Sequence, residues 1–250
     1  MTNSRPLGPL TPFIDATAGT ASAVTFGALS ALRRARAFHP SGIAVEATLD
    51  VEAKIHTGAP LFDRPGRRRC VVRFSRGAGM PEPLPDILGL ALRVLDVGDG
   101  DRCQDFLLVT SGAAPLVRSA LIPAQGYADR QYSSLLPYRV GTRTVLIGAR
   151  PLLSGGRSPR TFAELGEALA DARLRFVLEI AEPAGDWEPM GTIDFGRTLS
   201  EQESEALQFN VFNNTDGIDA VGVLNTIRRR AYEGSQRGRP KPVAQRTTKV

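Results

Sequence analysis

Segments in which apolar and polar residues alternate recur along the chain, and they constrain its fold more than any other feature. Residues 42–53 alternate over the length of one long strand, and Val72 and Phe74 share one face of a second strand around 70–75. Further strand-like segments cover 86–95, 104–111, 174–181, 190–197 and 207–212. A period of two places successive side chains on opposite faces of a sheet. The pattern predicts about seven short strands joined by Gly- and Pro-containing turns.

Segments with helical spacing accompany these strands. We expect helices over 15–37, 113–124, 161–172 and 223–237. Thr161 and Glu164 have the spacing of a capping box at the start of the third helix. Residues 1–14 contain Pro and Gly and predict a loose arm, whereas residues 240–250 are polar and basic and predict a disordered tail. We therefore expect a single domain over residues 15–239.

The composition limits the class of protein. The 250 residues carry a net charge of +5, and nearly all the positive charge is Arg, because Lys occurs only at 54, 241 and 249. Clustered arginines can bind nucleic acid, but no helix-turn-helix, zinc-finger or aromatic-plus-basic pattern accompanies them. Aromatic residues make up 6% of the chain, which is poor for stacking bases. Binding of carboxylates explains the arginines at least as well, so we expect no nucleic-acid partner.

Cysteine usage and hydropathy favour a soluble protein. The two cysteines, Cys70 and Cys103, provide neither a disulfide framework nor metal-ligand spacing, and each lies in an apolar segment that predicts a buried free thiol. No apolar segment reaches the length of a membrane span, and the N-terminus lacks a signal pattern. We expect a cytoplasmic protein with no membrane partner.

A tyrosine near the C-terminus carries the most specific chemistry. Arg228 and Tyr232 are four residues apart in the expected helix and share one face. A cation beside a phenol favours its ionised form, and tyrosinate is a known axial ligand of haem iron. Arg239 follows as a cation suited to a propionate carboxylate. The alternative interpretation is a basic amphipathic helix with Tyr232 as a half-buried anchor.

The spacing Arg-x-x-x-Tyr-x-x-x-x-Arg-x-Arg resembles the proximal motif of the haem catalases. The resemblance implies that Tyr232 ligates iron, that Arg228 stabilises the tyrosinate, and that Arg239 meets a haem propionate. Gly234 and Ser235 stand where the family usually has Asp-Thr.

Segments earlier in the chain resemble the distal side of the same family. Arg36, His39 and Gly42 match the spacing around the essential distal His, although Pro40 and Ser41 replace the usual small residues. The segment Val72-Arg73-Phe74-Ser75 matches a strand whose Arg binds a propionate and whose Ser hydrogen-bonds the distal His. Asp86 and Gly89 match the strand that follows. Arg73 and Ser75 take the implied roles, and Arg36 is assigned to the cofactor site.

The match departs from the family where peroxide is oriented. Catalases end the fourth strand with an Asn pair, whereas this chain has Val109, Thr110, Ser111 and Gly112. Thr110 or Ser111 would supply one hydroxyl, which is a less fixed donor than an amide; we assign Thr110 to the catalytic set. Three tyrosines lie nearby, at 127, 132 and 138. The simplest interpretation is that they pack in the core, and the alternative is that one of them is a lid residue or a competing iron ligand.

The resemblance implies an α+β fold, a catalase-like eight-stranded antiparallel β-barrel with flanking helices, that binds haem b. We expect a peroxidase that reduces hydrogen peroxide or organic hydroperoxides with a small-molecule electron donor. The alternatives are a true catalase, a hydroperoxide-rearranging protein like allene oxide synthase, and a haem-binding protein without catalysis. Catalase relatives self-associate, so a homo-oligomer is a further expectation.

Overall fold

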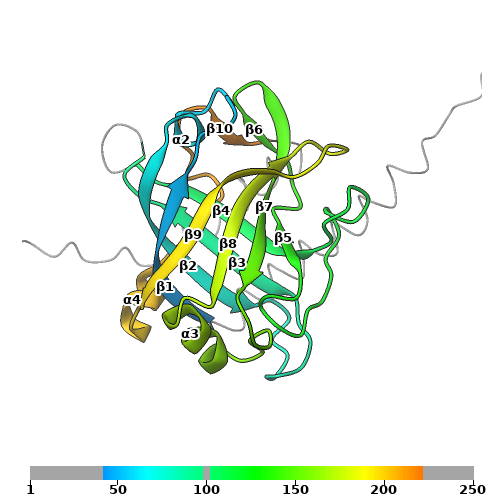
Figure 1. The fold of residues 1–250 in the computed structure, drawn as a ribbon, viewed down its shortest axis with the longest axis vertical. Helices are drawn as coiled ribbons and strands as arrows, with labels where there is room; N and C mark the ends of the chain where they lie inside the picture. Colours follow the sequence, from blue (N-terminus) through cyan, green and yellow to red (C-terminus); the bar gives the residue numbers. More distant parts are fainter. Residues whose placement is uncertain (1–41, 98–101, 222–250) are drawn as a thin grey trace, which may run out of the picture.

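The core of the protein is a closed barrel of eight antiparallel strands (Figure 1), seen in a computed structural model that describes residues 42–97 and 102–221. The strands are β1 (Gly42–Val51), β2 (Gly66–Arg76), β3 (Leu88–Val94), β4 (Gln104–Ser111), β5 (Gln131–Ser133), β7 (Arg143–Leu153), β8 (Leu174–Ala181) and β9 (Glu188–Thr198). Each pairs with the next, and β9 pairs with β1, so the eight-stranded barrel has no open edge. The predicted eight-stranded antiparallel barrel is confirmed.

Two short strands extend one end of the barrel. β6 (Tyr138–Val140) pairs with β7, and β10 (Ile218–Ala220) pairs with β6. Figure 1 shows them beside the four-residue helix α2 (Pro60–Asp63), while α3 (Phe162–Ala170) and α4 (Glu201–Ala206) lie at the opposite end. No helix within 42–97 or 102–221 combines the length and the hydropathy needed to cross a membrane.

The barrel interior is filled by alternate residues of each strand. On β2, Cys70, Val72 and Phe74 are buried, whereas Arg73 and Ser75 lie on the other face and are half-buried. Phe74 packs in a tilted arrangement against Phe176, with 5.8 Å between ring centroids. The two faces of β2 therefore follow the alternation read from the sequence.

Helix α3 begins where the sequence predicts. The Thr161 hydroxyl accepts a hydrogen bond from the Glu164 N–H. The Glu164 carboxylate, however, accepts from the Arg160 N–H instead of completing a reciprocal pair with Thr161. The helix buries Leu165, Ala168 and Leu169.

Two expected elements are absent, and four strands, β5, β6, β7 and β10, were not predicted. Residues 113–124 form turns instead of a helix, because the segment crosses the barrel surface and returns to pair Ile122 N–H with the Thr110 carbonyl. Residues 207–212 form no strand either, since side chains on β4 take backbone donors of this region. The strands β5, β6 and β7 lie in 131–153, where both faces are largely buried and no clean alternation arises.

Four other expectations fall outside the described residues. These are the N-terminal arm over 1–14, the helices over 15–37 and 223–237, and the basic tail over 240–250.

Candidate functional site on the outer face of the barrel

A row of residues crosses the outer face of β1 to β5 at one end of the barrel. The ladder register places these residues side by side in the order Gly42, Ser75, Gly89, Val109 and Ser133. Neighbouring strands are about 4.8 Å apart, so Ser75 and Val109 lie about 10 Å from one another across Gly89. The row places two serines, two glycines and one valine side by side, with Val109 and Ser133 buried.

A second row runs parallel to the first, one side-chain position further along the strands. It contains Ala44, Arg73, Ala91 and Leu107 in register. Arg73 is therefore flanked on both sides by alanine. The two rows therefore place residues with short side chains or none on either side of Arg73 and Ser75.

The two glycines of the first row are required by their neighbours. A Cβ atom at Gly42 would lie 2.9 Å from a guanidinium nitrogen of Arg73, and one at Gly89 would lie 2.6 Å from the Ser75 hydroxyl oxygen. Both distances are shorter than a non-bonded contact allows. Glycine at 42 and 89 therefore lets Arg73 and Ser75 keep their positions over the sheet.

Arg73 supplies positive charge at this face. Its side chain is partly buried, and desolvation by burial lowers the pKa of its guanidinium from the ordinary value. An arginine remains charged in proteins, and its planar donors suit a carboxylate. The position fits the propionate-binding role that the catalase resemblance implies.

Gly42, the first residue of β1, pairs directly with Ser75, and His39 precedes Gly42 by three residues in the sequence. His39 lies outside the described residues, so the hydrogen bond from Ser75 to the distal His that the catalase resemblance implies stays a prediction.

Thr110 lies on the opposite face of β4 from this row. It follows Phe106 and Leu108 in the alternation, is fully buried, and its hydroxyl accepts a hydrogen bond of 3.1 Å from the Leu88 N–H. Val109 occupies the outer position beside Gly89. The structure therefore brings Val109, and not Thr110, to the face of Ser75. From the sequence we assigned Thr110, because the pattern does not show which of two successive residues of this strand faces the same side as Ser75.

A buried ion pair fixes the segment that follows α4 against the same barrel. Asp105 on β4 accepts two hydrogen bonds of 2.7 Å from Arg93, and also accepts from the Asn210 N–H and the Asn213 amide. The Asp105 side chain is fully buried and that of Arg93 is 17% exposed. Its hydrogen bond to Asp105 raises the pKa of Arg93. Sequence analysis missed both residues, since an Arg and an Asp on adjacent strands give no local signal.

The loop that precedes β3 is held by Asp86. Its carboxylate accepts backbone N–H groups of Ala78, Met80 and Ile87, and it lies 3.6 Å from the buried Arg76 guanidinium. Asp86 thus positions the start of β3, on which Gly89 follows three residues later.

Three tyrosines of the central region are core residues. Tyr127, Tyr132 and Tyr138 are at most 2% exposed and belong to the hydrophobic core. Burial raises the pKa of Tyr132 well above its ordinary value, which disfavours the tyrosinate form. Their packing role agrees with the simpler of the two interpretations from sequence.

The remaining predicted site residues fall outside the described ranges. Arg36, His39, Arg228, Tyr232 and Arg239 belong to residues 1–41 and 222–250, so their roles stay predictions. Within 42–97 and 102–221, no group of three or more His, Cys, Asp and Glu is arranged to hold a metal ion.

The outer face fits a haem group in two respects. The residues directly beside Arg73 are alanines and those beside Ser75 are glycines, which suits the approach of a flat macrocycle, and a Cβ atom at Gly42 or Gly89 would displace the polar groups presented there. Arg73 also provides a cation for a carboxylate. Holding the iron would fall to Tyr232, as the sequence predicts.

Comparison with known proteins gives matches of structure only. No protein-family model matches the chain, and no curated protein matches its sequence. A fungal catalase solved at 1.9 Å aligns with a TM-score of 0.62 at 12% identity, covering 96% of this chain and 66% of the catalase. Catalase A from Saccharomyces cerevisiae aligns with a TM-score of 0.61 at 11% identity, covering 94% and 66%. The chain spans 66% of the length of either catalase. At this identity the likeness concerns the fold, and the described chain has the eight-stranded barrel of the catalases.

Proposed function

We propose that this protein is a haem-dependent peroxidase that reduces hydrogen peroxide or organic hydroperoxides with an external electron donor. The observation that supports it is the pair of rows on the outer face, where Arg73 and Ser75 stand among Gly42, Ala44, Gly89 and Ala91. Arg73 contributes a cation and Ser75 a hydroxyl, and each is flanked in its row by residues with a short side chain or none.

Haem, when bound, would supply a ferric iron that accepts peroxide and exchanges electrons with it. Arg73 would anchor a propionate, Tyr232 would hold the iron, and Arg228 would favour the ionised phenol. Ser75 would hydrogen-bond His39 and fix its orientation. His39 would take a proton from one peroxide oxygen and return it to the leaving oxygen, which lowers the cost of breaking the O–O bond.

The residue beside Gly89 favours a peroxidase over a true catalase. Disproportionation requires a second peroxide to be held and oxidised, which calls for a fixed polar donor in the distal space. The register places Val109 at the outer position in the row of Ser75, and a valine donates no hydrogen bond. The loss of such a donor weakens the oxidation of a second peroxide more than the first reduction.

The test compares two activities of the haem-loaded full chain. Oxidation of a phenolic donor by hydrogen peroxide is measured by absorbance, and oxygen release is measured with an electrode. We expect donor oxidation to exceed oxygen release, and His39→Ala to lower donor oxidation by about 100-fold or more, the usual size of a proton-transfer contribution. Robust oxygen release with negligible donor oxidation contradicts the proposal. Donor oxidation that stays at the background level of free haem in both the wild type and His39→Ala indicates a haem-binding protein without catalysis.

A second variant tests the reason for the preference. Val109→Asn places an amide donor in the row of Ser75, and we expect it to raise oxygen release relative to donor oxidation. Val71→Asn is the matched control, because Val71 lies on the same face of β2 in a different row. An equal effect of both variants, or none from Val109→Asn, removes Val109 as the basis of the preference.

A further inference from the structure

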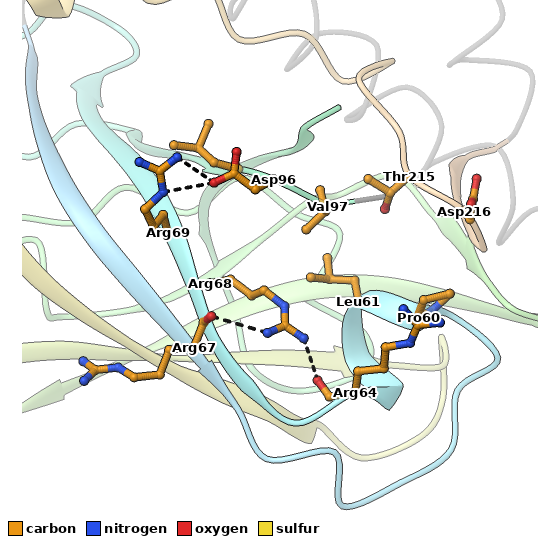
Figure 2. Close-up of a pocket in the computed structure, with 11 residues that line it drawn as sticks. Pro60, Leu61, Arg64, Arg67, Arg68, Arg69, Asp96, Val97, Thr215 and Asp216 are labelled. Carbon is orange, nitrogen blue, oxygen red and sulfur yellow. Dashed lines mark hydrogen bonds and ion pairs between the residues drawn. The ribbon is translucent and has the colours of Figure 1, made fainter. Parts of the chain in front are cut away.

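A cavity rich in arginine lies at the end of the barrel that carries α2. Its volume is about 570 Å³, within the range of small-molecule sites. Figure 2 shows the lining side chains, which come from α2, the start of β2, the end of β3 and the turn before β10. The cavity is separate from the face around Ser75, because seven residues of β2 between Arg68 and Ser75 span about 23 Å.

The cavity carries excess positive charge. Its lining contains Arg64, Arg67, Arg68 and Arg69 against two carboxylates, those of Asp96 and Asp216. Arg69 pairs with Asp96 at 2.6 Å, and Asp216 pairs with Arg102 at 3.3 Å. Within the described residues, neither Arg64, Arg67 nor Arg68 makes an ion pair, although ten other arginines in those residues do. Figure 2 shows the side chains of Arg67 and Arg68 leaving β2 on opposite sides, so the guanidinium charges of Arg64 and Arg68 remain for a ligand in the cavity.

The central guanidinium is held in place by the backbone. Arg68 donates to the Arg67 carbonyl at 3.3 Å and to the Arg64 carbonyl at 3.0 Å, as the dashed lines in Figure 2 show. A guanidinium has five N–H donors, so three remain available. Carbonyl partners orient the group without neutralising its charge. A preorganised cation of this kind loses less conformational entropy when an anion binds.

The opposite wall of the cavity is apolar. Leu61 and Val97 are nearly buried and line it together with Pro60 and Leu95. In Figure 2 the Leu61 side chain lies between the Arg68 guanidinium and Val97. A ligand that fills the cavity therefore meets cations on one side and a hydrocarbon surface on the other.

From this arrangement we infer a binding site for a small molecule that carries two or more linked phosphate groups, with Arg64 and Arg68 as the phosphate ligands. Guanidinium groups match phosphate oxygens with paired donors, and two of them within one cavity favour a polyanion over a single charge. The apolar wall favours a nucleoside polyphosphate over an inorganic one. The inference does not depend on the haem or on the proposed peroxidase activity.

The test is calorimetric titration of the full chain with ADP and, separately, with inorganic tripolyphosphate at moderate salt. We expect saturable binding of one ligand per chain. Tighter binding of ADP assigns part of the affinity to the apolar wall, and equal binding assigns it to the phosphates alone. The double variant Arg64→Gln/Arg68→Gln should weaken binding by at least about tenfold, since each charge-assisted contact contributes several-fold.

The matched control removes the same charge elsewhere. Arg130→Gln/Arg157→Gln replaces two exposed arginines outside the cavity and should change the affinity less than about threefold. Arg64→Gln alone, at an exposed position whose side chain makes no ion pair, still reports on the site if the double variant folds poorly. Equal loss in the two double variants, no saturable binding by the wild type, or preferred binding of duplex DNA overturns the inference.

Discussion

Gly89 lies directly opposite Ser75 in the ladder between β2 and β3, and a Cβ atom at position 89 would stand 2.6 Å from the Ser75 hydroxyl oxygen. The substitution Gly89→Ala must therefore turn the hydroxyl away from its present position. We expect about a tenfold loss of peroxidase activity with haem still bound, because only the orientation of His39 depends on that hydroxyl. Steady-state kinetics and the absorption spectrum of the same sample check both parts.

The matched control for this substitution is Gly196→Ala on β9. A Cβ atom there meets Glu46 at ordinary distances of 3.6 and 3.8 Å, so the alanine is accommodated. Activity should stay within about twofold of the wild type. A loss of equal size in both variants would attribute the effect to general strain and not to Ser75.

Asp105 should contribute far more to stability than an exposed aspartate in a similar pair. Asp105→Asn removes the charge from a fully buried carboxylate that binds Arg93, Asn210 and Asn213. The Arg93 cation, whose side chain is 17% exposed, then lacks the counter-charge of this pair. Because a largely buried charge without its partner is costly, we expect the free energy of unfolding to fall by about 3 kcal/mol. Asp219→Asn breaks the exposed pair with Arg139 and should cost less than about 1 kcal/mol. Urea unfolding measures both, and equal losses contradict this account.

Stability should fall in acid partly through Glu188. Its hydrogen bonds to Arg143 lower the pKa of this carboxyl in the folded state. A folded pKa below the unfolded value means that the stabilisation is present above the unfolded pKa and is lost as pH falls through the folded one. Since the side chain is 35% exposed, we expect a contribution below about 1 kcal/mol. Urea midpoints of wild type and Glu188→Gln should differ at pH 7 and converge below pH about 4; a constant difference contradicts the assignment.

The two thiols should differ in reactivity. Burial raises the pKa of the Cys70 thiol to about 12, and desolvation also raises that of the partly exposed Cys103. A chromogenic disulfide reagent should modify Cys103 slowly in the native protein and Cys70 only after unfolding. Cys103→Ser should then leave the native protein unreactive. Rapid modification of Cys70 in that variant would contradict the prediction, because it would show that β2 around Cys70 becomes exposed to solvent more readily than its burial indicates.

Elements with strong local signals could be predicted from the sequence. The alternation around Val72 and Phe74 defined both faces of β2, and Thr161 marked the start of α3. The strands β5 to β7 gave no such signal. Both of their faces are largely buried, so apolar and polar residues do not alternate along them.

The candidate site shows how far strand register, which the sequence does not reveal, limits the prediction of site residues. Arg73 and Ser75 were placed correctly on one outer face, because alternation within a single strand defines it. Whether Val109 or Thr110 shares that face depends on the pairing of β3 with β4, and one residue of shift reverses the answer. The Arg93–Asp105 pair and the arginine cavity depend on segments far apart in the chain, which no local pattern connects.

The central claim is that haem binds at the outer face of this barrel with Tyr232 as its ligand. It is tested by the absorption spectrum of the purified chain supplied with haem, beside Tyr232→Phe and Arg73→Gln. We predict one haem per chain with a five-coordinate ferric tyrosinate spectrum, loss of that spectrum in Tyr232→Phe, and about tenfold weaker haem binding in Arg73→Gln, the size expected for one charge-assisted pair. A wild-type protein that binds no stoichiometric haem would contradict the claim and leave only the barrel fold in common with the catalases.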